Sequence, residues 1–165
     1  AIDILEQRAS QLNFSTLSII KKQKQNQANK ITKLALETAK SRSKHGAIER
    51  FFLINDSTTI AVEVPVYLTN DDIKYFKDRK FEINLENRQT PITGHIDILQ
   101  LRNGLLHILD YKPEAGKVQP IEQLTIYALA LSRKLNLPLY YLKCAWLDEN
   151  NYYEFFPLHA VYKSR

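Results

Sequence analysis

The chain has 165 residues, of which 44% are hydrophobic and 25% charged, and its net charge is +5. This composition is that of one ordinary globular domain, and the single cysteine, Cys144, excludes a disulfide framework or a metal site built from several cysteines. There is no apolar run of about 18 residues and no signal peptide, so a membrane span is excluded and we expect a cytoplasmic protein.

Two helices are predicted at the N-terminus. Apolar residues recur at helical spacing over 1–14, and a polar segment over 17–39 contains neither glycine nor proline. We therefore expect residues 1–44 to form a basic helical extension and residues 45–165 to form the core.

Positive charge is concentrated in this extension. Positions 21 to 44 hold eight basic residues and one acid, so they carry +7 and the rest of the chain carries −2. Such an excess favours a polyanion partner, with Lys21, Lys22 and Lys24 as candidate nucleic-acid-binding residues. The alternative is a solvated helix face.

A helix and a strand follow, each with one acid of interest. The helix continues over 47–52 and contains Glu49, which is either a site residue or an exposed acid paired with a neighbouring base. The strand covers 58–68 and places Glu63 among alanine and valine, where an acid is rarely buried without a partner. The alternative for Glu63 is the solvent face of an outer strand, and Pro65 indicates an edge or a bulge.

A short helix over 69–80 and a poorly patterned connection over 81–93 lead to a predicted β-hairpin over 94–112. Asn103-Gly104 stands between two apolar runs, and both residues accept the positive φ of a type I′ turn. With this two-residue loop, the predicted register places Asp97 opposite Asp110 and puts Lys112 on the same face.

Two opposed carboxylates at the end of an apolar hairpin destabilise it unless a cation compensates them. Oxygen ligands of this kind suit Mg²⁺ or Mn²⁺, and Lys112 supplies a second positive charge. The alternatives are a solvated strand end, or an Asp110–Lys112 pair without a metal.

The loop after the hairpin contains Lys117, a candidate contact to a nucleic-acid backbone. A helix over 120–135 follows, and Gln123 and Tyr127 share one of its faces because they are four residues apart. These two residues are candidate substrate contacts, or ordinary helix surface.

A second hairpin is predicted over 139–147 and 152–158, with a heavy load of tyrosine, tryptophan and phenylalanine. Exposed aromatic rings can stack on bases. We favour core and cross-strand packing, which is the commoner use of aromatic residues in strands.

Three blocks of this sequence resemble one family. Gly94-His-Ile-Asp97, Asp110-Tyr-Lys112 and Gln123-Leu-Thr-Ile-Tyr127 are similar to the G-x-x-D, D-Y-K and Q-x-x-x-Y blocks of the PD-(D/E)xK nuclease superfamily, in its RecB-type branch. The resemblance covers about residues 46 to 156. It implies a restriction-endonuclease-like α/β fold: a helix, a three-stranded antiparallel meander, a helix and two further strands in a mixed sheet.

The resemblance also implies a magnesium-dependent nuclease acting on DNA. Asp97, Asp110, Glu49 and the backbone carbonyl of Tyr111 are the expected metal ligands, with Glu63 nearby. Lys112 is expected to assist the attacking water, and Gln123 and Tyr127 to orient the substrate.

Two alternatives remain at this stage. The first is that the chain is a catalytically silent nucleic-acid-binding module on a nuclease fold. The second is that it is one domain of a larger repair or defence nuclease, in a multidomain or oligomeric assembly. Retention of Asp97, Asp110 and Lys112 together favours catalysis. The sequence leaves open whether cleavage is internal or from an end, and whether RNA is also a substrate.

Overall fold

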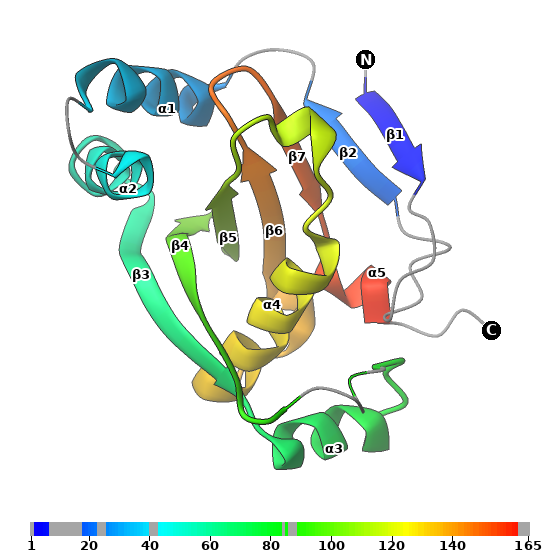
Figure 1. Ribbon diagram of the computed structural model, residues 1–165. Helices are drawn as coiled ribbons and strands as arrows, with labels where there is room; N and C mark the ends of the chain where they lie inside the picture. Colours follow the sequence, from blue (N-terminus) through cyan, green and yellow to red (C-terminus); the bar gives the residue numbers. More distant parts are fainter. Residues whose placement is uncertain are drawn as a thin grey trace.

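The structure is a computed structural model that describes residues 2–6, 18–22, 26–39, 43–83, 85 and 89–161 (Figure 1). These residues build a seven-stranded sheet in the order β1-β2-β7-β6-β5-β4-β3. Strands β3, β4 and β5 form an antiparallel meander, β5 pairs with β6 in parallel, and β6 pairs with β7 antiparallel. The predicted mixed α/β architecture is therefore confirmed. The strands are β1 (Ile2–Glu6), β2 (Ser18–Lys22), β3 (Thr59–Leu68), β4 (Ile92–Arg102), β5 (Leu105–Tyr111), β6 (Leu142–Leu147) and β7 (Tyr152–Phe155).

The β4–β5 hairpin has the predicted turn and register. Asn103 and Gly104 have φ values of 52° and 76°, as a type I′ turn requires. The ladder starts at this turn and ends with Ile98 paired to Leu109, which is the predicted register.

Helices cover both faces of the sheet. One buried apolar cluster includes residues of α1 and α2, and a second includes residues of α3, α4 and α5. Helix α4 also makes the long crossover that the parallel strands β5 and β6 need. None of the described helices is long and apolar enough to span a bilayer. The helices are α1 (Gln27–Thr38), α2 (Lys44–Asn55), α3 (Asn70–Asp78), α4 (Ile121–Leu135) and α5 (Pro157–Val161), with short 3₁₀ helices η1 (Ala115–Lys117) and η2 (Leu139–Tyr141).

The N-terminal segment differs from its prediction. Residues 2–6 and 18–22 are strands rather than helices, and in the described part of the long expected helix only Gln27–Thr38 is helical. Residues 7–17 and 23–25 of the two predicted helices lie outside the described residues. The physical reason is a tertiary one: β2 pairs with the edge of β7, and β1 pairs with β2. A strand partner far along the chain overrides helical spacing. The proposed division between an extension and a core at residue 44 stays a prediction.

The aromatic hairpin packs as predicted, in the core. The rings of Trp146 and Tyr153 stack with their centroids 4.9 Å apart. Tyr140 and Tyr141 lie in η2, before the hairpin, and are exposed. The buried aromatic residues of the two strands are Trp146, Tyr152, Tyr153 and Phe155.

Candidate active site

Three carboxylates lie side by side on three neighbouring strands. The β3–β4 register places Glu63 opposite Asp97, and Glu63 is exposed on β3, the edge strand of the sheet, as its alternative interpretation expected. The β4–β5 ladder ends one residue before Asp97 and Asp110, which are the next pair along the two strands. Neighbouring strands are about 4.8 Å apart, so this register brings Glu63, Asp97 and Asp110 together across the sheet.

Helix α2 adds a fourth acid to this group. Glu49 is buried, 6% exposed, which excludes the alternative of a solvated helical acid. The pKa of Glu49 is raised to about 8 by burial, by a hydrogen bond with Glu63 and by the charges of Glu63 and Asp110. The pKa of Asp97 is also raised to about 8, by burial, by a hydrogen bond with Asp110 and by the charge of Asp110. The backbone N–H of Tyr111 donates to Asp97 Oδ2 over 3.1 Å, and this hydrogen bond acts in the opposite direction by lowering the pKa. The four acids therefore share one electrostatic environment.

Lys112 provides positive charge beside this acidic group. Its Nζ lies 2.8 Å from Asp110 Oδ2, and its backbone N–H donates to the carbonyl of Leu147 over 2.9 Å. Lys112 and Asp110 are two residues apart at the end of a strand, so their side chains leave the chain on the same side. The D-Y-K block thus sets a lysine against a buried carboxylate.

His45, which was not among the candidate residues predicted from the sequence, also approaches this group. His45 lies in the first turn of α2, and its Nε2 is 3.1 Å from the carbonyl oxygen of Tyr111 and 3.8 Å from Asp97 Oδ2. An imidazole nitrogen, a carboxylate and a backbone carbonyl therefore approach one point. The signal was present in the sequence, because His45 precedes Glu49 by four residues and so shares its helix face.

The first and third sequence blocks meet where α4 crosses β4. A methyl group added at Gly94 would lie 2.5 Å from Tyr127 Cε1, so only glycine lets the ring rest on the strand. Gln123 Nε2 donates to the hydroxyl of Tyr127 over 3.0 Å. Tyr127 is thereby held against Gly94 of β4, which precedes Asp97 by three residues. Tyr127 is therefore not ordinary helix surface.

A family model described as the PD-(D/E)XK nuclease superfamily matches residues 2–149. The chain belongs to this superfamily. Comparisons with curated proteins and with solved structures gave no match. PD-(D/E)XK proteins are generally nucleases and typically use divalent metals, and the mixed sheet described above is consistent with their restriction-endonuclease-like fold.

The donor groups of this PD-(D/E)XK site suit a divalent metal ion in their chemistry. Carboxylate and carbonyl oxygens are the ligands that Mg²⁺ and Mn²⁺ prefer. A divalent cation would also offset the repulsion that raises the pKa values of Glu49 and Asp97. Among the described residues, however, no three His, Cys, Asp or Glu side chains are already arranged to hold a metal. In this structure Asp110 forms an ion pair with Lys112.

Among the candidate DNA-contacting lysines of this PD-(D/E)XK chain, Lys21 lies away from the acids. Lys21 is on a strand, β2, and its Nζ lies 5.7 Å from the centroid of the Tyr153 ring. Strands β7 and β6 separate β2 from β5, a distance of about 14 Å across the sheet. Lys117 is exposed in η1. The side chain of Lys22 and the whole of Lys24 lie outside the described residues.

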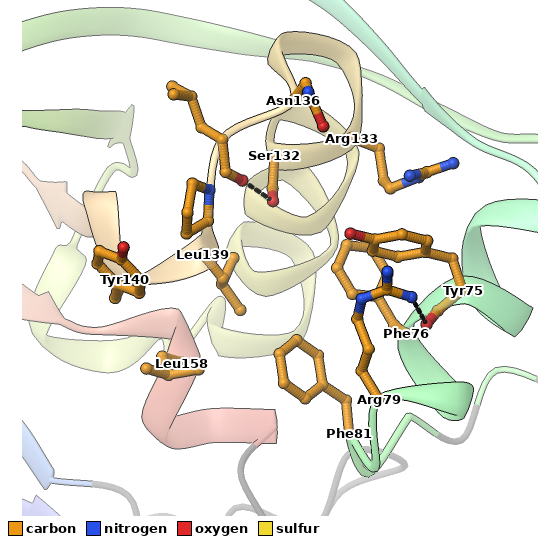
Figure 2. Close-up of a pocket in the computed structure, with 12 residues that line it drawn as sticks. Tyr75, Phe76, Arg79, Phe81, Ser132, Arg133, Asn136, Leu139, Tyr140 and Leu158 are labelled. Atoms are coloured by element: carbon orange, nitrogen blue, oxygen red, sulfur yellow. Dashed lines mark hydrogen bonds between the residues drawn. The ribbon is translucent and has the colours of Figure 1, made fainter.

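The pocket in Figure 2 also lies apart from the acids, between α3, the end of α4, η2 and α5. Its volume is about 320 Å³, and none of the residues that line it is a candidate site residue. The guanidinium groups of Arg79 and Arg133 lie 3.3 and 3.8 Å from the centroid of the Tyr75 ring, and Arg133 Nε binds Asp72 Oδ1 over 3.0 Å. The two contacts of Arg133 join α3 to α4, so they serve packing.

Proposed function

We propose that the chain is a metal-dependent nuclease of the RecB-type branch that hydrolyses phosphodiester bonds of DNA. The observation that carries the proposal is the row of Glu63, Asp97 and Asp110 on three neighbouring strands, with Lys112 against Asp110. Asp110 is buried, Asp97 is half-buried and Glu63 is exposed, and like charges placed together in this way cost stability unless a cation compensates them. The contact of Gly94 with Tyr127 supports the RecB-type assignment, because it joins two of the three blocks in space.

In this proposal Asp97 and Asp110 hold the metal together with the backbone carbonyl of Tyr111. His45 joins them, because its Nε2 already lies beside Tyr111 O and Asp97 Oδ2. Glu49 completes the set from α2. When bound, Mg²⁺ or Mn²⁺ would lower the pKa of a water molecule and stabilise negative charge on the scissile phosphate.

Lys112 has a catalytic role that does not involve metal binding. Its ammonium group is held at the site by Asp110. From there it positions or helps to deprotonate the attacking water and offsets negative charge in the transition state. Glu63 and Glu49 share a hydrogen bond, so in this proposal Glu63 orients Glu49.

Substrate contacts complete the proposal. Gln123 and Tyr127 orient the DNA strand from α4, next to the carboxylates. Lys21, Lys22, Lys24 and Lys117 contact phosphate groups farther along the nucleic acid, where positive charge steers and holds a polyanion.

The test is cleavage of linear and circular DNA, single- and double-stranded, in Mg²⁺, Mn²⁺ or EDTA. We expect wild-type cleavage to need the metal and to fall at least about a thousandfold in Asp110→Asn, which removes charge but keeps shape. Asp71→Asn is the matched control, because Asp71 is an exposed acid of α3. The circular substrates separate internal cleavage from cleavage at ends.

Two results would overturn the proposal. If Asp110→Asn cuts at the wild-type rate, Asp110 has no part in catalysis. If the wild type binds DNA in a salt-dependent way but cuts none of the substrates with either metal, the chain is a binding module.

A further inference from the structure

A second hollow lies between the start of β4 and the start of α4, on the strand that also carries Asp97. Its volume is about 460 Å³, within the range of small-molecule sites. Gln123 and Tyr127 form part of its lining, and Tyr127 rests on Gly94, close to Asp97. The hollow therefore lies on the strand that carries Asp97 and on the helix that carries Gln123 and Tyr127.

The polar groups of the hollow are unsuited to a phosphate. They are the hydroxyl of Thr93, the amides of Gln119 and Gln123, and the carboxyl of Glu122. No lysine, arginine or histidine is among the described residues that line it.

The same groups suit the edge of a nucleobase. Side-chain amides both donate and accept hydrogen bonds, as base edges do. The rest of the lining is apolar or aromatic and includes Ile92, Pro120, Ile126 and the Tyr127 ring. Bases stack on such surfaces with little dependence on sequence.

We propose that this hollow receives one unpaired nucleobase of the substrate strand, with Gln119 and Thr93 as base-contacting residues. This inference rests on the proposed function, because it takes a DNA strand as the substrate. A base inside a duplex is paired and stacked, so entry requires a single strand, an open end or an extruded base. Strand β4 rises about 3.3 Å per residue, which places Thr93 about 13 Å from Asp97, a few nucleotides from the cleaved bond.

The test measures binding in EDTA, so that it does not depend on metal or cleavage. Two single strands of equal length and phosphate count are compared, one with bases and one fully abasic. We expect Gln119→Leu to lower the affinity for the base-bearing strand about three- to tenfold, the effect of one lost hydrogen bond, and to leave abasic binding unchanged. Thr93→Leu, which narrows the hollow, has the same expected pattern.

Gln27→Leu is the matched control, because Gln27 is exposed on α1, which packs with α2 on the other apolar cluster. Both Gln119 and Thr93 are exposed, so their variants retain the fold. The inference is overturned if Gln119→Leu and Thr93→Leu change binding of the two strands equally, or change neither.

The two proposals fail separately. A wild type that cuts no DNA in Mg²⁺ defeats the nuclease, while base-dependent loss of binding in Gln119→Leu still establishes the base site. Cleavage in Mg²⁺ with no base-dependent loss keeps the nuclease and removes the base site.

Discussion

Glu49 and Asp97 hold protons at pH values where free carboxyl groups are ionised, because the pKa of each is raised to about 8. Between the ordinary pKa and about 8, the folded protein binds a proton that the unfolded chain releases. The free energy of unfolding therefore falls as pH rises through this window, and the loss is complete above about pH 8. Without a metal, the site destabilises the fold under mildly alkaline conditions.

Glu49→Gln tests this at a single residue. The amide keeps the shape of the side chain and removes its charge, so the melting temperature in EDTA should fall less with pH than in the wild type. At about pH 8 the variant should melt a few degrees higher. Thermal unfolding between about pH 5 and pH 9 measures the effect, and Glu37→Gln, at an exposed acid of α1, is the control.

The same measurement in the presence of Mg²⁺ tests whether a bound cation offsets the repulsion between these carboxylates. An ion that binds the folded site stabilises it by mass action, so Mg²⁺ should raise the wild-type melting temperature most at alkaline pH. A smaller rise is expected in Glu49→Gln. Parallel pH profiles for the wild type and Glu49→Gln would contradict the argument.

At the scale of elements, one glycine determines how α4 lies on β4. Gly94→Ala places a methyl group 2.5 Å from Tyr127 Cε1, so the ring or the helix must move. We expect a loss of about 1–3 kcal/mol in the free energy of unfolding, the usual cost of overpacking. Adding Tyr127→Ala should recover part of this loss, because it removes the clashing ring. Urea unfolding of the two single variants and the double variant measures the coupling.

Gly46→Ala is the control for this prediction. Gly46 lies in α2, and an added methyl group meets nothing nearer than 4.0 Å, so the substitution should cause no loss. Additive losses in the Gly94→Ala and Tyr127→Ala double variant would mean that the two residues do not act on each other.

Local patterns predicted the elements whose partners lie close in the chain. Asn103-Gly104 fixed the β4–β5 register through its own backbone preference, and that register located Asp97 and Asp110. Residues 2–6 and 18–22 were predicted wrongly because their conformation depends on β7, more than a hundred residues away. Helical spacing within such a segment carries no information about that partner.

The candidate site shows the same division. The D-Y-K block and its opposed aspartate were visible in the sequence, because two strands and one turn place them. The spacing of His45 and Glu49 places both on one face of α2, but the approach of His45 to the carbonyl of Tyr111 was not visible, because it depends on how α2 packs on the sheet. The burial of Glu49 depends on that packing too.

At the scale of the whole molecule, charge is divided between two regions. The window from position 21 to 44 carries +7, whereas the remainder, which holds the carboxylate site, carries −2. The described part of this window belongs to β2, α1 and the start of α2. A long polyanion can contact this basic region while one of its phosphates lies at the acids, since an extended strand of a few nucleotides spans the intervening sheet.

This arrangement gives a prediction about DNA binding. Neutralising Lys21, Lys22 and Lys24 to glutamine should weaken binding similarly for all DNA sequences. It should also reduce the slope of log affinity against log salt by up to about 2 to 3, which corresponds to three lost phosphate contacts. Binding titrations at several salt concentrations in EDTA measure both quantities. Cleavage at saturating DNA should stay near the wild-type rate, because these lysines lie outside the carboxylate cluster.

The matched control neutralises Lys74, Lys77 and Lys80, near α3, and so removes the same total charge from another part of the surface. If position matters, this control retains most of the wild-type affinity and salt slope. Equal losses in the two triple variants would show that net charge alone attracts the polyanion. The N-terminal lysines would then be a solvated surface rather than a nucleic-acid contact, and the path of the strand would have to be sought closer to Lys112 and Lys117.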